Sequence, residues 1–553
     1  MRVSRAIVDQ LAEGGIDTVF GIPGKQTLPL NEAIEAREDV RFVSTRHETA
    51  VSHAAWGYAE TSGRPAATLV VPGPGDMNAM NGLKNARNDC TPLVHIAVET
   101  DPTVRGGDGI HETPPDTYDN VVKENTLVER PSAVRVEVAQ AIETAMTPPK
   151  GPVRVGVPKN VLPEEYAIAT PQPLSPASPP APAEGDIEAA AACLASADRP
   201  AVLVGGGVRS AQAGSELVSV ADVLDAPVIT TYKGKGIVPD ENDRVAGTLS
   251  GSASPELLDC LADSDALLAV GTDFDAVATR RWSVEMPDDI VQITLSPGDL
   301  GTGYDLTVGI VADAKHALDA LESALDETAG DGGGRKRATV VRDAFDQRID
   351  SLLDDQPPLS SVGALRAVRE AVPEGTVVSV DAGGFRVWGL NAFAASGPRA
   401  YVNPGSWATM GTGLPAALGA QLANPDRDVL ALTGDGGLMM CIHELHTAAS
   451  EGIPVTVVVF RNDDYAIISE EAERAFEISD GAYDWSGAPL DFVAIAAGMG
   501  VEASRAETPA AIEAELADAL DSDDTRLVEI PTDPEEPQAS EWLSRSDQSG
   551  DAN

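Results

Sequence analysis

Two polar side chains stand at the ends of two apolar segments and could hold a metal ion together. Asp435 lies in a Gly-Asp-Gly turn directly after the apolar run 429–432, and Asn462 follows the apolar run 455–460. Short apolar runs of this kind predict buried strands whose carboxyl ends share one edge of a sheet. Mg²⁺ takes one or two such oxygen ligands and shares the oxygens of a phosphate. The turn before the next helix-like segment offers backbone N–H groups to a diphosphate.

The spacing of this pair resembles the cofactor motif of thiamine diphosphate (ThDP) enzymes, a GDG turn followed some two dozen residues later by a paired Asn. Asn462 follows Asp435 by 27 residues, and Arg461 replaces the first Asn of the family pair. The resemblance implies that Asp435, Asn462 and the carbonyl of Asp464 bind the metal. It also implies cofactor contacts at Gly434, Gly436 and Gly437. For the GDG turn alone, a plain strand–turn–helix with a surface Asp is the alternative.

A carboxylic acid near the N-terminus corresponds to the other half of that site. The segment Thr45-Arg46-His47-Glu48-Thr49-Ala50, before the helical pattern 53–59, resembles the family segment whose Glu hydrogen-bonds the aminopyrimidine ring of ThDP. That position is Glu48 in this chain. A carboxyl in an apolar pocket has a raised pKa and favours the imino tautomer, which acts as the base at the thiazolium carbon. The alternative is a helix N-cap or a surface carboxylate.

A glycine- and alanine-rich segment lies between the two halves. Residues 405–420 resemble the family stretch in which a bulky apolar side chain wedges between the two cofactor rings, and Met410 holds that position. The backbone of Ala408 and Met410 would contact the pyrimidine. Gly383 and Gly384 stand where relatives place backbone contacts to the diphosphate. A helix packed closely on a sheet is the other interpretation of 405–420, and both can hold.

Two residues are candidates for work on the substrate. His111 stands where acetolactate synthases carry a Gln that faces the cofactor, and an imidazole could donate or accept a proton there. The alternative is a loop histidine without a role. Lys25 follows the Phe-Gly-Ile-Pro-Gly segment and is a candidate to bind a substrate carboxylate, because a Lys ammonium is a good point charge for anions.

A second cofactor, FAD, is weighed for the middle of the chain. In the acetolactate synthase branch this region binds FAD, and Gly205-Gly206-Gly207 lies at a corresponding place. A lone glycine cluster is a weak signal. Asp273 replaces the Arg usual in that branch, and Thr294 and Ser296 replace an acidic pair. These departures disfavour FAD.

The remaining histidines and cysteines do not predict a second metal site. His443 and His446 are three residues apart rather than the four of a zinc HExxH helix, so both are interpreted as ordinary helix residues. The cysteines form no CxxC pair and argue for a reducing cytoplasm. They are Cys90, Cys193, Cys260 and Cys441.

The charge of the chain is extreme. The formal net charge is −48, with 87 acidic and 39 basic residues, yet the periodic apolar segments are intact. A carboxylate-covered surface of this kind suits high intracellular salt, which screens self-repulsion, so we expect a halophilic protein. The same charge makes nucleic acid and anionic membranes poor partners. No apolar run reaches the length of a membrane span.

The order of apolar and amphipathic segments predicts an α/β protein with three doubly wound parallel-sheet domains. We expect a pyrimidine-binding domain at 1–165, a central domain at 185–327 and a diphosphate- and metal-binding domain at 355–532. Residues 166–184 and 328–354 are expected linkers, and 533–553 an expected tail.

The resemblance implies a ThDP- and Mg²⁺-dependent enzyme that decarboxylates a 2-oxo acid and ligates the resulting enamine to a second carbonyl, as acetolactate synthase does. A simple 2-oxo acid decarboxylase, such as benzoylformate decarboxylase, is the enzymatic alternative. An idle ThDP-binding partner subunit is an alternative of another class. In the family the two cofactor halves meet across a subunit interface, which implies a homodimer or homotetramer.

Overall fold

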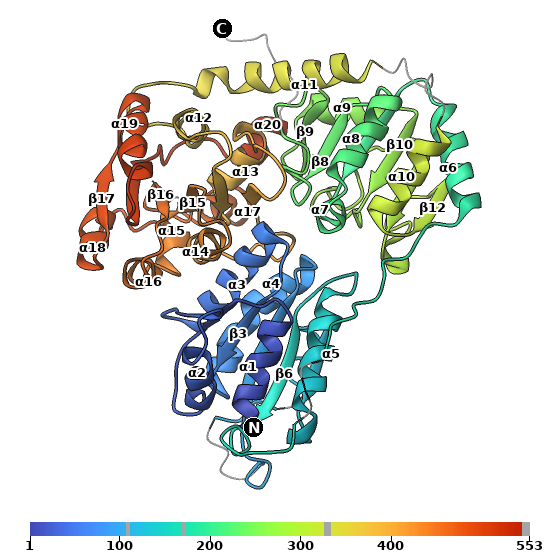
Figure 1. Ribbon diagram of the computed structural model, residues 1–553. Coiled ribbons are helices and arrows are strands. Elements are labelled where there is room, and N and C mark those ends of the chain that lie inside the picture. The colour runs from blue at the N-terminus through green and yellow to red at the C-terminus, as the bar shows by residue number, and fades with distance from the viewer. Residues whose placement is uncertain are drawn as a thin grey trace.

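The computed structural model describes residues 1–106, 111–114, 116–168, 170, 172–325, 333–479 and 481–544. Three six-stranded sheets follow one another along the chain, with helices against their faces (Figure 1). Neighbouring strands in all three sheets are parallel. The predicted class, α/β with three doubly wound parallel sheets, is confirmed.

Strands and helices mostly alternate along the first two domains. The N-terminal domain contains α1 (Val3–Glu13), β1 (Thr18–Gly21), α2 (Leu28–Glu35), β2 (Arg41–Ser44), α3 (Glu48–Ser62), β3 (Ala66–Val70), α4 (Pro74–Asn88), β4 (Leu93–Glu99), β5 (Glu124–Leu127), η1 (Pro131–Ala133), α5 (Val134–Met146) and β6 (Val153–Pro158). The central domain contains α6 (Glu184–Ala195), β7 (Pro200–Val204), α7 (Gly206–Ala211), α8 (Gly214–Val223), β8 (Val228–Thr231), β9 (Val245–Leu249), α9 (Pro255–Ala262), β10 (Ala266–Val270), β11 (Asp289–Thr294), η2 (Pro297–Asp299), β12 (Val308–Val311) and α10 (Ala314–Ala324).

Helix α11 (Gly334–Ile349) and η3 (Asp350–Leu352) then lead to the C-terminal domain. That domain contains α12 (Ser361–Ala371), β13 (Val377–Val380), α13 (Gly384–Ala392), β14 (Tyr401–Val402), α14 (Gly413–Ala423), β15 (Val429–Gly434), α15 (Asp435–Met439), α16 (Glu444–Glu451), β16 (Thr456–Arg461), α17 (Ala466–Phe476), α18 (Phe492–Gly498), β17 (Glu502–Arg505), α19 (Pro509–Leu520), β18 (Arg526–Pro531) and α20 (Ala539–Ser544). Strands such as β3 and β10 are buried along their whole length, which explains their predominantly apolar sequences.

In each sheet the strand order reverses beside the strand that begins the domain. The orders are β2-β1-β3-β4-β6-β5, β12-β11-β10-β7-β8-β9 and β14-β13-β15-β16-β18-β17. The reversals therefore lie between β1 and β3, between β7 and β10, and between β13 and β15. Connections leave such a point in opposite directions and open a crevice at the carboxyl ends of the strands, where doubly wound proteins bind ligands.

Helix α3 of the N-terminal domain packs against α14 of the C-terminal domain, and glycines make the crossing close. A Cβ on Gly57 would lie 2.1 Å from the carbonyl oxygen of Ala416, and a Cβ on Gly419 would lie 1.8 Å from that of Ala54. A larger residue at either glycine would force the helices apart. Buried residues of both helices belong to one hydrophobic core, so the outer two domains are packed together within one chain (Figure 1).

Lys233 of the central domain joins all three domains. Its ammonium donates to Glu60 Oε2 at 3.0 Å and to Asp89 Oδ2 at 3.1 Å, both in the N-terminal domain. It also donates to the carbonyl of Asn403 in the C-terminal domain at 3.3 Å. Burial works against the charge of Glu60, but Lys233 and its neighbour Arg209 outweigh burial and lower the pKa of Glu60 to about 2.

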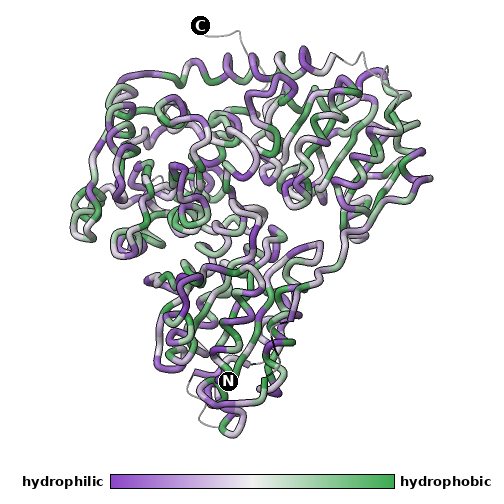
Figure 2. Tube along the Cα trace, in the orientation of Figure 1, coloured by the Kyte–Doolittle hydropathy of each residue, from purple (hydrophilic) through white to green (hydrophobic). Residues whose placement is uncertain are grey.

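Two segments differ from the sequence expectation. The expected linker 328–354 contains α11, a hydrophilic helix that runs from the central to the C-terminal domain (Figures 1 and 2); its first residues, 328–332, lie outside the described part. The expected tail from 533 contains α20, and Glu536 Oε2 accepts a hydrogen bond from the Ser361 backbone N–H at 2.5 Å. Residues 545–553 lie outside the described part. Of the helices within the described ranges, none is long and apolar enough to span a membrane.

Candidate active site

The carboxyl ends of β13, β15 and β16 bring polar residues to one edge of the C-terminal sheet. The register pairs Val380 with Leu432 and Gly434 with Phe460, so the three strands end nearly in step. Asp381, Asp435 and Asn462 follow these ends. The predicted juxtaposition of Asp435 and Asn462 is therefore present, beside the strand-order reversal.

Asp435 is buried and is held by backbone groups. Its Oδ1 accepts from Gly436 N at 2.8 Å, and its Oδ2 accepts from Asn462 N at 3.1 Å and Asp463 N at 2.7 Å. Burial raises the pKa of Asp435 to about 6, although these N–H groups favour the ionised form. Across the described ranges, no Lys or Arg nitrogen makes an ion pair with this carboxylate. A buried carboxylate without a basic partner is suited to a bound cation.

The turn after β16 carries the other predicted metal ligands. Asn462 Oδ1 accepts from Asp464 N at 3.2 Å, and Ser469 Oγ donates to Asp464 Oδ1 at 2.6 Å. Arg461, which replaces the first Asn of the family pair, is committed elsewhere. Its Nε and Nη2 donate to Asp463 at 3.0 and 2.7 Å. The Arg461 charge is thus taken up by a carboxylate beside it.

Asp381 fastens the loop that carries Met410. Its Oδ2 accepts from Gly411 N at 3.2 Å and from Thr433 Oγ1 at 3.0 Å, and its Oδ1 accepts from Thr412 N at 3.2 Å. Burial raises the pKa of Asp381 to about 6 against these hydrogen bonds. One carboxyl therefore connects β13, the 404–412 loop and the end of β15.

The end of the Met410 side chain lies near the Gly-Asp-Gly turn. A Cβ on Gly436 would lie 3.3 Å from Met410 Cε and 2.7 Å from Tyr465 Cε1, so only glycine leaves room for both side chains. Ala408 has a φ of 41°, a conformation that residues with a side chain avoid and that recurs at functional sites. The remaining predicted cofactor contacts lie at the ends of β13 and β15. They are Gly383, Gly384, Gly434 and Gly437.

Glu48 is the first residue of α3. Asn78 Nδ2 donates to Glu48 Oε2 at 3.0 Å, and a Cβ on Gly75 would lie 3.0 Å from Glu48 Oε1. The N-cap of α3 is His47, whose Nδ1 accepts from Thr49 N at 3.2 Å. The alternative interpretation of Glu48 as an N-cap is therefore wrong.

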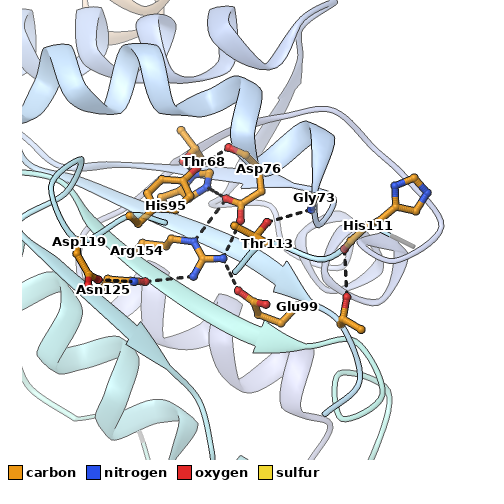
Figure 3. Close-up of polar contacts among 12 residues, drawn as sticks. Thr68, Gly73, Asp76, His95, Glu99, His111, Thr113, Asp119, Asn125 and Arg154 are labelled. Carbon is orange, nitrogen blue, oxygen red and sulfur yellow. Dashed lines mark hydrogen bonds and ion pairs between the residues drawn. The ribbon is translucent and has the colours of Figure 1, made fainter. Parts of the chain in front are cut away.

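His111 lies beside the first turn of α4, which carries Gly75. Thr100 Oγ1 donates to the carbonyl of His111 at 3.1 Å, and a Cβ on Gly73 would lie 2.6 Å from His111 Cα. Gly73 N also donates to Thr113 Oγ1 at 3.1 Å. His111 is exposed, with φ at 63°, and its ring points away from the buried polar residues beneath it (Figure 3). The backbone of His111 is thus anchored while its imidazole is accessible.

Lys25 is exposed in the turn after β1. A Cβ on the preceding Gly24 would lie 2.2 Å from Val71 Cγ1, just past the end of β3. The turn therefore lies at the same strand-order reversal as Gly73. A role in substrate binding stays a prediction.

His443 and His446 have structural contacts at the junction of α16 with the segment before α3. Arg46 Nε donates to His446 Nδ1 at 3.0 Å, and His443 Nε2 lies 3.3 Å from Glu444 Oε1. In the chain as far as it is described, no group of three or more His, Cys, Asp or Glu side chains is placed to hold a metal ion. A metal ion bound by Asp435 would therefore need amide, carbonyl or ligand oxygens as its further ligands.

The glycine cluster of the central domain is explained by backbone packing. A Cβ on Gly205 would lie 2.1 Å from the carbonyl oxygen of Gly271, across the reversal between β7 and β10. The carboxylates of Asp273, Asp275 and Asp299 interact electrostatically at the adjoining strand ends. Negative charge there repels a diphosphate. The residues present do not fit FAD.

The two halves of the predicted cofactor site remain on separate domains. The side-chain hydrogen bond of Glu48 is made to Asn78 of the N-terminal domain, and those of Asp435 are made within the C-terminal domain. Over the described ranges, no hydrogen bond or ion pair joins Glu48 to Asp435 or Asn462.

Three contributors were not among the sequence candidates. Asp381 was detectable as an acid directly after the strand-like run 377–380 and close before Gly383 and Gly384, a pattern similar to that of Asp435. Asn78 and Tyr465 carry no such local signal, because Asn78 reaches Glu48 across 30 residues and Tyr465 meets Gly436 only in the folded sheet.

Comparison with known proteins agrees with this geometry. Family models of thiamine pyrophosphate enzymes match residues 1–120 (N-terminal TPP binding domain), 187–321 (central domain) and 381–530 (C-terminal TPP binding domain). The chain is 30% identical to a probable acetolactate synthase large subunit of Methanococcus aeolicus, over 97% of this chain and 92% of the relative. It is also 30% identical to the acetolactate synthase isozyme 1 large subunit of Escherichia coli, over 96% and 94%. The chain belongs to the thiamine diphosphate-dependent enzymes, in the branch of the acetolactate synthase large subunits.

Proposed function

We propose that this enzyme uses ThDP and Mg²⁺ to decarboxylate a 2-oxo acid and to join the remaining fragment to a second carbonyl compound, as an acetolactate synthase does. The observation that carries the proposal is the placement of the buried Asp435 and of Asn462 just past the ends of two adjacent parallel strands, with Met410 and the glycine turn beside them. The relatives from Methanococcus aeolicus and Escherichia coli are both acetolactate synthase large subunits, which supports carboligation.

The residues of the C-terminal domain would hold the metal and the diphosphate. Asp435, Asn462 and the carbonyl of Asp464 supply hard oxygens, the donor set that Mg²⁺ prefers. The unpaired negative charge of Asp435 fits a divalent cation, whose arrival removes the cost of a buried carboxylate. Met410, Ala408 and the glycines bound the space in which the cofactor would lie.

ThDP, when bound, supplies the carbanion that attacks a 2-oxo acid and the electron sink that accepts the charge left by CO₂. Glu48 would hold a proton against the aminopyrimidine ring. His111, exposed beside the same turn, would exchange a proton with the reacting group, and Lys25 would attract the substrate carboxylate.

We further infer a homodimer or homotetramer in the cytoplasm of a halophile. A second chain would bring its Glu48 to the Asp435 site of the first, since no hydrogen bond or ion pair joins the two residues within the described ranges of one chain. FAD has no part in the proposal, because the central domain presents the carboxylates of Asp273, Asp275 and Asp299 at its strand ends.

The proposal is tested with purified protein in molar KCl with ThDP, Mg²⁺ and pyruvate, with quantification of CO₂, acetolactate and acetaldehyde. We expect acetolactate to form in proportion to the CO₂ released. We expect turnover to fall by about 10²- to 10⁴-fold in Glu48→Gln. Glu13→Gln, at an exposed position of α1, is the matched control and should retain full turnover. Acetaldehyde in place of acetolactate would favour the simple decarboxylase. ThDP binding without turnover of any 2-oxo acid would favour the idle partner subunit.

A further inference from the structure

A cavity of about 290 Å³ lies between the central and C-terminal domains, under α11. Strand β9 and α9 contribute from the central domain, and α12 and α13 from the C-terminal domain. Two hydrogen bonds join the domains in the cavity wall. Thr248 N donates to Asn391 Oδ1 and Thr248 Oγ1 donates to the carbonyl of Leu390, both at 2.9 Å. Clefts at domain boundaries are common ligand sites, and this volume is at the lower end of their range of about 300–1,000 Å³.

Two guanidinium groups in the cavity wall lack a carboxylate partner. Arg369 donates to the carbonyl of Val372 at 3.1 Å and lies over the Phe393 ring, 5.6 Å from its centroid. Arg342 donates to the carbonyls of Val245 and Asp243. Within the described ranges neither arginine makes an ion pair, and carbonyl oxygens orient a guanidinium without neutralising its charge.

The other charged groups of the wall largely cancel one another. Lys235 is paired with Asp240, and Arg366 is paired with Asp346. The remaining acid of the wall, Glu370, is exposed. Two arginines without an ion pair therefore share the cavity wall with one exposed carboxylate.

This imbalance is unusual in so acidic a protein. The chain has 87 acidic residues and 39 basic ones, so carboxylates outnumber basic groups by more than two to one. Burial lowers the pKa of Arg369, while Glu241 and Glu374 raise it without forming an ion pair with the guanidinium. A partly buried cation that lacks an ion pair is further stabilised by an anion from solution.

The cavity walls also indicate what kind of molecule would carry the anionic group. Phe345 and Val341 of α11, Leu257 of α9 and Leu390 of α13 provide apolar surface beside the arginines. A planar guanidinium binds carboxylate and phosphate oxygens in a fork. The volume admits a small molecule and not a dinucleotide.

We propose that this interdomain cavity binds a small organic oxyanion, a carboxylate or phosphate on a short apolar body, through Arg342 and Arg369. Its site is separate from the Asp435 centre. Helix α13 links the two, because it begins at Gly384 in the predicted diphosphate site and ends at Ala392 in the cavity wall. Binding requires no turnover and so stands independently of the proposed reaction.

The test is isothermal titration of the full chain, saturated with ThDP and Mg²⁺, at constant molar KCl. Benzoate and phenyl phosphate are the probes, and the tighter one identifies the head group. Benzamide, the uncharged analogue of benzoate, should not bind. Arg369→Gln and Arg342→Gln should each weaken binding at least tenfold. Arg335→Gln, an exposed residue of α11 paired with Asp222 and Asp243, is the matched control and should bind as the parent protein does.

Cooperative melting of each variant establishes that it is folded, and Arg369→Lys keeps the charge and should bind with intermediate affinity because it lacks the planar fork. Benzamide binding as tightly as benzoate, unchanged affinity in Arg369→Gln, or no probe binding to the parent protein would overturn the proposal.

Discussion

At the scale of single residues, the site combines strained backbone with accessible side chains. Ala408, His111 and Asp463 all have positive φ, at 41°, 63° and 58°. Such conformations persist only where the surroundings impose them. For His111, the surroundings are the hydrogen bond from Thr100 and the close approach of Gly73. The backbone of this histidine is thus fixed although its ring is exposed.

We expect His111→Ala to lower kcat by about tenfold or more while the affinity for ThDP is unchanged, because a proton-transfer group is lost and no cofactor contact is. Initial rates and ThDP titration measure the two quantities. His316→Ala, on the surface of α10, is the control. A variant with parental kcat would reject the role of His111 in catalysis.

At the scale of elements, a buried polar network joins α4, β4 and β6 beneath the His111 loop (Figure 3). Arg154 Nη2 donates to Asp76 Oδ2 at 2.7 Å and is also paired with Glu99. A neutral His95 satisfies two partners, with Nε2 at 2.9 Å from Asp76 Oδ1 and Nδ1 at 2.7 Å from Thr68 Oγ1. Burial alone would raise the pKa of Asp76, but His95 and Arg154 hold it well below its usual range.

We expect Arg154→Met to lower the free energy of unfolding by about 3–5 kcal/mol at pH 7, because Asp76 and Glu99 lose the buried cation that they share and only Glu99 keeps a second one, Arg105. In the parent protein the low pKa of Asp76 gives stability that is present above its unfolded pKa and lost as pH falls. In the variant the carboxyls bind protons more tightly when folded. The difference in unfolding free energy between the parent protein and the variant should therefore shrink as pH falls toward 4. Denaturant unfolding in molar KCl at several pH values measures this, and a pH-independent deficit would contradict it.

At the scale of the whole molecule, the separation of Glu48 from Asp435 bears on whether the active site forms within one chain or between two chains. If the site forms between two chains, co-expression of Glu48→Gln with Asp435→Asn should restore activity that neither variant has alone. Random pairing leaves one intact site in half of the dimers, so about a quarter of parental activity is expected. Turnover of the co-purified mixture is the measurement. No recovery in verified mixed dimers would place the site within one chain.

The net charge of −48 is also a property of the whole molecule. Raising KCl from 0.1 to 2 M shortens the screening length from about 10 Å to below about 3 Å and suppresses repulsion among carboxylates. We expect the midpoint of thermal unfolding to rise on the order of 10 °C. Sucrose at equal osmolality is the control, since it acts by exclusion and not by screening. An equal midpoint in both salt concentrations would reject adaptation to salt.

Helix α11 shows where sequence patterns were insufficient. Its buried residues are Ala338, Val341, Phe345 and Ile349, together with Gly334 at its start. They form one narrow apolar stripe in a hydrophilic segment that follows a glycine run. Such a stripe becomes a stable helix only when another surface covers it, and both neighbouring domains do so in this fold.

The sequence by itself determined the α/β class and the residues of the cofactor motifs, because both are written in local patterns. Apolar runs mark the strands, and a turn or acid directly after a run lies at a strand end. Asp435, Asn462, Glu48 and Met410 follow from that logic and from family resemblance.

The tertiary structure alone decided what joins distant segments. Asp381 reaches Thr433 across 52 residues, Asn78 reaches Glu48 across 30, and Gly57 meets Ala416 at a helix crossing. Hydrogen bonds and close packing depend on distances in space, which a linear pattern does not contain. The interdomain cavity with Arg342 and Arg369 has the same origin, since elements distant in sequence form its walls.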